Sequence, residues 1–163
     1  MNWASPVASD PQLRDAFHES ERDVIIRNNR VACILGVIFM PLGSMLDFAV
    51  YRSEMASFFG YRILCSALLG VVWFLFATSF GRRHYRILGL IEVSLPMLFM
   101  SYMIYRTDGA ASPYYAGINL VIVGTGILLR WRLVDTLWMF SVGFVLYLSA
   151  CFAQEIKEWQ TFF

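Results

Sequence analysis

Apolar residues dominate five stretches of the sequence, and short connectors rich in basic or aromatic residues separate them. A bilayer core about 30 Å thick is crossed by roughly 20 helical residues, and each stretch is close to that length. The stretches lie near residues 31–51, 58–79, 87–105, 115–130 and 134–152. The pattern predicts an all-α fold, a polytopic transmembrane helix bundle that occupies residues 31–163.

The fourth stretch is the shortest, and it carries three glycines, Gly117, Gly124 and Gly126. Small residues at helix interfaces let neighbouring backbones approach closely. We therefore expect this stretch to be a buried helix that its neighbours approach closely, rather than a helix that faces lipid.

The first 30 residues are polar and are expected to form a separate helix on the cytoplasmic side or at the inner membrane surface. Asp10 can cap this helix, and Pro11 suits its first position. A thin apolar stripe follows at helical spacing, formed by Leu13, Phe17, Ser20 and Val24. A charged helix that is solvated on all faces and leads into the first span is an equal alternative, and Asn28 and Asn29 could break the helix.

The segment after the fifth stretch is polar and then aromatic. Trp159, followed by Phe162 and Phe163, resembles an interfacial belt that leads into a sixth span beginning near residue 159. A sixth crossing would return the chain to the cytoplasm, where an output domain would lie. We interpret the sequence as a piece of a longer membrane protein, with a complete five-span protein as the alternative.

Composition agrees with an integral membrane protein. Hydrophobic residues make up 58% of the chain and the mean hydropathy is +0.58, which leaves too little polar surface for a soluble globule of 163 residues. The net charge of +1 is spread over the connectors and the N-terminal segment, so no nucleic-acid partner is expected. Cys33, Cys65 and Cys151 lie far apart inside apolar stretches and form no metal-ligand pattern.

The basic residues predict the orientation of the chain. With the N-terminus in the cytoplasm, that side holds nine arginines, and the other side holds Arg52, Arg106 and Lys157. Such a bias is the positive-inside signal of membrane proteins. The expected location is the bacterial inner (cytoplasmic) membrane, in a multi-pass arrangement with a cytoplasmic N-terminus.

Charged side chains inside the apolar stretches are the first candidates for function, because hydrocarbon penalises them unless they are paired or face a cavity. Asp47 and Arg62 flank the first outer connector at similar depth, which predicts an ion pair. The pair either fixes the packing of the first hairpin or forms the charged floor of a ligand pocket that opens outward.

Other polar residues of the outer leaflet could line the same pocket for a small lipophilic ligand. Together with Asp47 and Arg62, the candidates are Ser101, Tyr102, Tyr114, Tyr115 and Asn119. Pro113 stiffens this loop, and Asn119 brings an amide about one turn into the bilayer. A helix start with an aromatic belt and one interhelical hydrogen bond would explain the same residues without a ligand.

Glu92 is the other unusual charged residue, because it lies inside the third stretch, four residues before Pro96. A proline inside a helix frees a backbone carbonyl and can kink the helix. Glu92 is expected to lie close enough to the arginines of the inner side to form an ion pair with Arg30 or Arg86. A proton relay is the alternative role for a lone membrane carboxylate.

The residue inventory argues against several chemistries. His18 and His84 lie outside the apolar stretches, so they cannot hold a haem or a metal within the spans. Lys157 is the only lysine and lies in a connector, which leaves no partner for a retinal Schiff base. No recognisable catalytic motif occurs, so we expect neither an enzyme nor a cofactor.

The sequence resembles the six-span input modules of bacterial signalling proteins, which are fused to histidine kinases and nucleotide cyclases. The membrane sensor of the cholera autoinducer receptor kinase has a similar plan. The resemblance is carried by Leu35-Gly36, Met40-Pro41, Leu46 to Tyr51, Gly60 to Cys65 and Ala111 to Leu120. It implies a lipophilic or small-molecule signal that is read within the membrane, and a helix that leads to a cytoplasmic output domain.

Three functions therefore stand as hypotheses. The first is a receptor input module, in which ligand binding between helices shifts a two-state packing and the exit helix passes the change to a dimeric effector. The second is a small transporter or channel subunit, for which Glu92, Asp47 and Arg62 would have to line one path. The third is a ligand-free membrane anchor that dimerises through a glycine-rich face such as Gly117 to Gly126.

Overall fold

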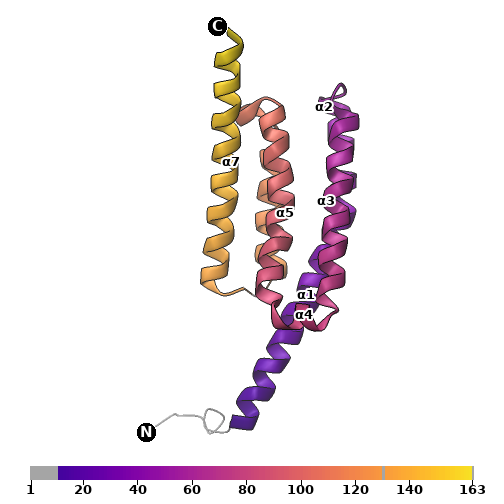
Figure 1. Ribbon diagram of the computed structural model, residues 1–163, viewed down its shortest axis with the longest axis vertical. Coiled ribbons are helices and arrows are strands. Elements are labelled where there is room, and N and C mark those ends of the chain that lie inside the picture. The colour runs from indigo at the N-terminus through magenta and orange to yellow at the C-terminus, as the bar shows by residue number, and fades with distance from the viewer. Residues whose placement is uncertain (1–10, 130, 163) are drawn as a thin grey trace.

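The computed structural model describes residues 11–129 and 131–162, and these residues form helices joined by short connections (Figure 1). In chain order, the elements are α1 (Pro11–Leu42), α2 (Ser44–Val50), α3 (Met55–Phe76), α4 (Ser79–Arg83), α5 (Tyr85–Arg106), the 3-10 helix η2 (Gly109–Ala111), α6 (Tyr115–Leu128) and α7 (Leu133–Phe162). The predicted all-α fold class is confirmed for the described residues.

Four helical stretches are long and apolar enough to cross a membrane. They are Glu19–Val50 in α1 and α2, Met55–Phe76, Tyr85–Arg106 and Leu133–Lys157 in α7. The fourth predicted stretch forms α6, an apolar helix of 14 residues. At 1.5 Å per residue α6 is about 21 Å long, which is shorter than a bilayer core of about 30 Å.

Helix α5 forms the centre of the bundle, with α1 and α3 on one side and α7 on the other (Figure 1). Half of the residues in its most apolar segment are buried, whereas the share is 17% in the most apolar segments of the first stretch and of α7. The outer helices expose large apolar side chains, such as Phe74 on α3 and Phe144 on α7. A bundle with an apolar exterior suits a hydrocarbon surrounding, because lipid tails do not penalise these side chains.

Helix α6 is less buried than its glycines predict. Only Ile118 and Thr125 are buried among its residues. Gly117 does allow a close approach, since a Cβ there would lie 2.6 Å from Sδ of Met100 on α5. Gly124 and Gly126 face open space, so the expectation of a helix enclosed by its neighbours is wrong for α6.

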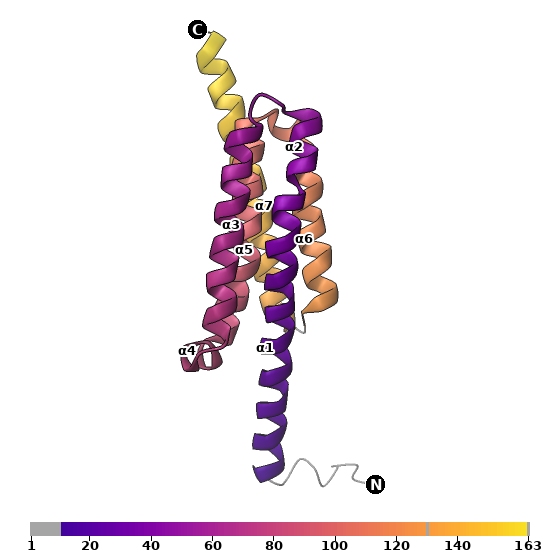
Figure 2. The same cartoon turned by 90° about the vertical axis from the view of Figure 1, so that its right-hand side faces the viewer.

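The two ends of the bundle differ in chemistry. We call one the arginine end: it holds α4, the start of α5 and the connection between α6 and α7. Its described arginines include Arg82, Arg83, Arg86 and Arg132. The other is the tyrosine end, which holds α2, η2 and the starts of α3 and α6, with Tyr51, Tyr61, Tyr114 and Tyr115. Helix α1 projects beyond the bundle at the arginine end, and α7 projects at the tyrosine end (Figures 1 and 2).

From residue 11 on, the N-terminal segment and the first span form one continuous helix, α1, so the segment leads directly into the span. Pro11 opens the helix, whereas Asp10 lies outside the described residues. The two asparagines do not break α1. Asn28 donates its side-chain amide to the carbonyl of Leu128 on α6 (3.1 Å), and Asn29 donates to the carbonyl of Ile25 (3.0 Å).

The segment expected to start a sixth span instead continues the fifth. Helix α7 runs without interruption from Leu133 to Phe162, so Trp159 lies on the same helix as the fifth apolar stretch. Its indole is 69% exposed. Within residues 131–162, therefore, no new span begins near residue 159, and Phe163 lies outside the described residues.

Candidate functional site

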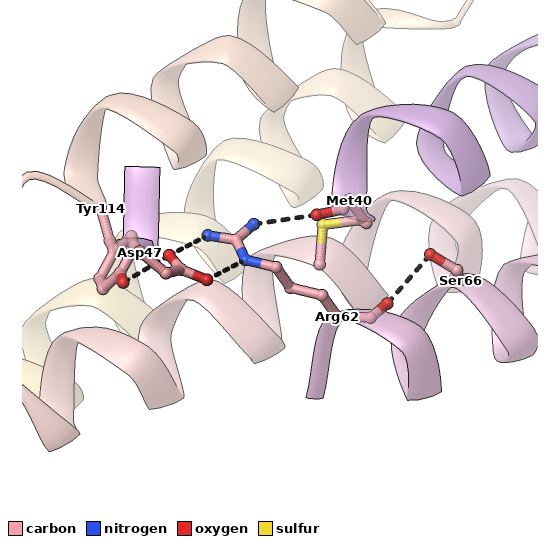
Figure 3. Close-up of polar contacts among 5 residues, drawn as sticks. All are labelled: Met40, Asp47, Arg62, Ser66 and Tyr114. Carbon is pink, nitrogen blue, oxygen red and sulfur yellow. Dashed lines mark hydrogen bonds and ion pairs between the residues drawn. The ribbon is translucent and has the colours of Figure 1, made fainter. Parts of the chain in front are cut away.

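A buried ion pair joins α2 and α3 at the tyrosine end (Figure 3). The side chain of Asp47 is fully buried, and Arg62 is 2% exposed. Nε of Arg62 lies 2.7 Å from Oδ2 of Asp47, and Nη2 lies 2.8 Å from Oδ1. Two parallel charge-assisted hydrogen bonds fix both distance and orientation. The ion pair expected between these residues is confirmed.

Tyr114 completes the site from the connection that leads into α6. Its hydroxyl donates to Oδ1 of Asp47 at 2.7 Å, and its ring lies 5.7 Å from the guanidinium carbon of Arg62. The ring of Phe58 on α3 contacts it edge-on, with centroids 5.8 Å apart. We call Asp47, Arg62 and Tyr114 the Asp47 cluster; it connects α2, α3 and the start of α6.

The break between α1 and α2 makes room for Arg62. Helix α1 ends at Leu42, and the carbonyls of a last helical turn lack helical partners. Nη1 of Arg62 donates to one of them, the carbonyl of Met40, at 3.2 Å (Figure 3). Gly43 leaves the necessary space, because a Cβ at this position would lie 2.2 Å from Nη1.

Pro41 creates a second free carbonyl in the same turn. Proline has no N–H, so the carbonyl four residues earlier loses its helical hydrogen bond. Here that carbonyl belongs to Val37, and it accepts a hydrogen bond from Oγ of Ser66 on α3 at 3.4 Å. The same hydroxyl also lies 2.9 Å from the carbonyl of Arg62 (Figure 3). This turn of α1 thus offers two backbone carbonyls, which accept hydrogen bonds from side chains of α3.

A more exposed set of contacts closes the tyrosine end. The hydroxyl of Tyr51 donates to Oδ2 of Asp108 at 2.5 Å, and Arg106 forms an ion pair with Glu54 at 3.2 Å. Burial and the hydrogen bond to Asp108 raise the pKa of Tyr51. Both contacts connect the loop after α2 to the loop after α5. An ion pair with such exposed side chains contributes about 0–1 kcal/mol to stability. The buried Asp47 cluster is therefore the more important of the two for the stability of this end.

The remaining pocket candidates do not join the Asp47 cluster. Tyr115 and Asn119 lie one helical turn apart on the exposed face of α6, and Tyr115 is 49% exposed. Tyr102 is exposed on α5 and packs edge-on against Tyr61 at 5.1 Å. Ser101 is buried, and its hydroxyl has no hydrogen-bond partner. The reason is helical register: Tyr114 faces the interior, so the residues after it turn outward.

Glu92 is buried on α5, but it does not form the expected ion pair. Both carboxylate oxygens lack a hydrogen-bond partner within the described residues. The guanidinium of Arg30 instead lies over the ring of Trp73 at 4.5 Å, and Nε of Arg86 donates to the hydroxyl of Tyr85 at 3.2 Å. The stacking on Trp73 and the exposure of Arg86 keep both arginines away from the carboxyl group.

A cavity of about 840 Å³ opens at the arginine end. It lies between α1, α5 and the start of α7, and its lining includes Asn29, Arg86, Trp131 and Asp135. No site was predicted at this position from the sequence. The available signal was the pair of asparagines at positions 28 and 29, next to the first apolar stretch.

Within the described residues, no group of three or more His, Cys, Asp or Glu side chains could hold a metal ion. Comparison of the chain with protein-family models, with curated proteins and with solved structures finds no match. The geometry of the bundle is therefore the basis for the function proposed below.

Proposed function

We propose that the chain is a membrane-embedded signal-input module, which binds a small lipophilic ligand between its helices and regulates a cytoplasmic output domain such as a histidine kinase or a nucleotide cyclase. The module acts as a homodimer in a bacterial inner membrane, with the arginine end in the cytoplasm. The observation that carries the proposal is the Asp47 cluster. Buried charges are expensive in a membrane and mark functional sites.

The position of α6 explains how the cluster can transmit a signal. Tyr114 ties the start of α6 to Asp47, and Asn28 of α1 ties its far end through the carbonyl of Leu128. Between these two points α6 buries only Ile118 and Thr125. A helix with so few buried residues can shift at a low cost.

Ligand binding would act on the hydrogen bond between Tyr114 and Asp47. A ligand hydroxyl can take the place of the Tyr114 hydroxyl on the carboxylate, and the displaced tyrosine releases the start of α6. The ligand shifts the equilibrium only by its difference in affinity for the two packings. The movement reaches the arginine end through Leu128, beside the cavity between α1, α5 and α7.

Pulsed electron paramagnetic resonance tests this proposal. Spin labels at Ile127→Cys on α6 and Phe74→Cys on α3 report the spacing of these helices at the arginine end, since both positions are well exposed. The background carries Cys151→Ser, because Cys33 and Cys65 are buried. We expect a medium-chain alcohol or ketone, added to the protein in lipid nanodiscs, to change the distance between the labels.

Two neighbouring tyrosines provide a matched control. Tyr114→Phe removes the hydrogen bond to Asp47 and should change the label distance without any added compound. Tyr115→Phe alters an exposed ring outside the cluster and should leave the distance unchanged. An unchanged distance in Tyr114→Phe and with every compound would contradict the proposal and favour a ligand-free dimerising anchor.

A further inference from the structure

Glu92 is the most unusual buried group outside the Asp47 cluster. It lies on the buried face of α5 and is 3% exposed, and neither carboxylate oxygen has a hydrogen-bond partner among the residues that the structure describes. This differs from Asp47, whose carboxylate receives hydrogen bonds from Arg62 and Tyr114. The same fold therefore holds one carboxylate that is paired with an arginine and one that has no charged partner among the described residues.

The surroundings of Glu92 supply no counter-charge. On α1, the buried Cys33 thiol is the polar group that faces it, and the guanidinium of Arg30 is held over Trp73. The cluster that contains Cys33 is completed by Val72 and Phe76 of α3, by Ile26 of α1 and by Leu88 of α5. On the α7 side, the next residue of α5, Val93, packs in a cluster with Met139.

A carboxylate in such a site would be strongly disfavoured. Removing an ion from water is energetically unfavourable unless hydrogen bonds or an opposite charge compensate it. Protonation removes the charge and gives the carboxyl group one O–H donor. The closed packing seen here therefore favours the neutral form of the Glu92 carboxyl group over the carboxylate.

Polar groups lead from Glu92 to the arginine end. Asn29 lies one helical turn before Cys33 on α1, and Gly89 lies one turn before Glu92 on α5. A Cβ at Gly89 would lie 3.1 Å from Oδ1 of Asn29, so the two helices are close at this level. Asn29 is 1% exposed and lines the cavity of about 840 Å³, and its Oδ1 has no hydrogen-bond partner in the described part of the chain.

We propose that Glu92 is a proton-binding site inside the bundle that exchanges its proton with water in the arginine-end cavity, past Cys33 and Asn29. On release, the carboxyl O–H bond breaks, the proton passes to a cavity water, and the carboxylate keeps the electron pair. The unpaired carboxylate then favours an opening between α1 and α5 that admits water. This site is separate from the Asp47 cluster and does not depend on a ligand there.

Dicyclohexylcarbodiimide, an apolar reagent for protonated carboxyl groups, tests the proposal. The carboxyl proton moves to a carbodiimide nitrogen, the carboxylate oxygen bonds to the carbodiimide carbon, and an acyl shift leaves a stable N-acylurea. Full-length protein in phosphatidylcholine and phosphatidylglycerol vesicles is labelled at a series of pH values and mapped by peptide mass spectrometry. We expect the Glu92 peptide to carry one reagent molecule in acidic buffer and to lose this label as the pH rises.

Glu92→Gln is the matched control, since glutamine resembles the neutral acid in shape. It should abolish the adduct on this peptide, and the infrared carbonyl band of a protonated carboxyl group should disappear with it. Wild-type protein without an adduct on Glu92 at any pH, with an adduct that is independent of pH, or without that carbonyl band would overturn the proposal. The wild-type measurements hold even where Glu92→Gln fails to fold.

The exchange route is tested by infrared spectroscopy in deuterated buffer. Asn29→Leu removes the polar group between Glu92 and the cavity and should slow the shift of the Glu92 carbonyl band after transfer to heavy water. Asn119→Leu changes the same residue type on the exposed face of α6 and should exchange as fast as wild type. Equal rates in Asn29→Leu and wild type would exclude this route.

Discussion

The Asp47 carboxylate and the Arg62 guanidinium depend on each other because both are buried. Removing one partner leaves an uncompensated charge, whereas removing both leaves two neutral groups of similar shape. Tyr114 adds a hydrogen bond to the carboxylate without a charge of its own. The energetic role of each residue is therefore visible only when the substitutions are compared in combination.

We expect Asp47→Asn and Arg62→Gln each to lower the free energy of unfolding by about 3–5 kcal/mol. The double variant should be more stable than the sum of the single effects predicts, because neither charge remains unpaired. Unfolding of the purified protein in detergent micelles measures all three values. Additive effects would show that the two side chains do not interact in the folded protein.

Glu92 shows what sequence reasoning at single residues can miss. Its position inside an apolar stretch marked it as unusual, and two arginines expected on the same side of the membrane made an ion pair the simplest expectation. The orientation of Arg30 toward Trp73 is a tertiary contact between α1 and α3. No local pattern around residue 30 indicates that stacking on an indole would replace the ion pair.

At the scale of elements, the break between α1 and α2 is the feature that shapes the site. Pro41 and the end of α1 leave the carbonyls of Val37 and Met40 to be satisfied from α3. Gly43 keeps open the space that Arg62 enters. Helix termini with unsatisfied carbonyls need such partners when they are buried, so α1, α2 and α3 form one unit.

Gly43→Ala should disrupt this unit. The added Cβ would lie 2.2 Å from Nη1 of Arg62, and overpacking of this kind costs about 1–3 kcal/mol. Gly60→Ala is the control: nothing lies within 4 Å of a Cβ there, and alanine in place of glycine in a helix gains about 0.5–1 kcal/mol. Thermal unfolding of both variants should therefore shift in opposite directions, and a shared direction would contradict the packing at Gly43.

The helices themselves were largely predictable. The expected ranges of the second, third and fifth stretches agree with α3, α5 and α7 to within a few residues at their starts, because long apolar stretches have few alternatives to helix. The ends of α1 and α7 were less predictable. Polar residues such as Asn28 and Asn29 weaken a hydropathy signal without ending a helix, and at both ends of the chain the helix continues past the apolar stretch.

At the scale of the whole molecule, the two ends of the bundle predict its orientation. The arginine end should face the cytoplasm under the positive-inside rule. Ser53→Cys at the tyrosine end and Ser79→Cys at the arginine end are matched exposed positions, each placed in a Cys151→Ser background. In intact cells, a membrane-impermeant maleimide should label Ser53→Cys, whereas Ser79→Cys should need permeabilised cells. The opposite pattern would reverse the orientation.

The sequence by itself determined the helical class, the apolar exterior, the difference between the two ends and the pairing of Asp47 with Arg62. These features depend on composition and on residues close in the chain: the two partners flank a single short connector. Tertiary structure alone decided that Tyr114 joins the pair while Tyr115 and Asn119 face outward, and that Glu92 forms no ion pair with Arg30 or Arg86. Such outcomes depend on the rotation of each helix against its neighbours, which the packing of several helices sets together.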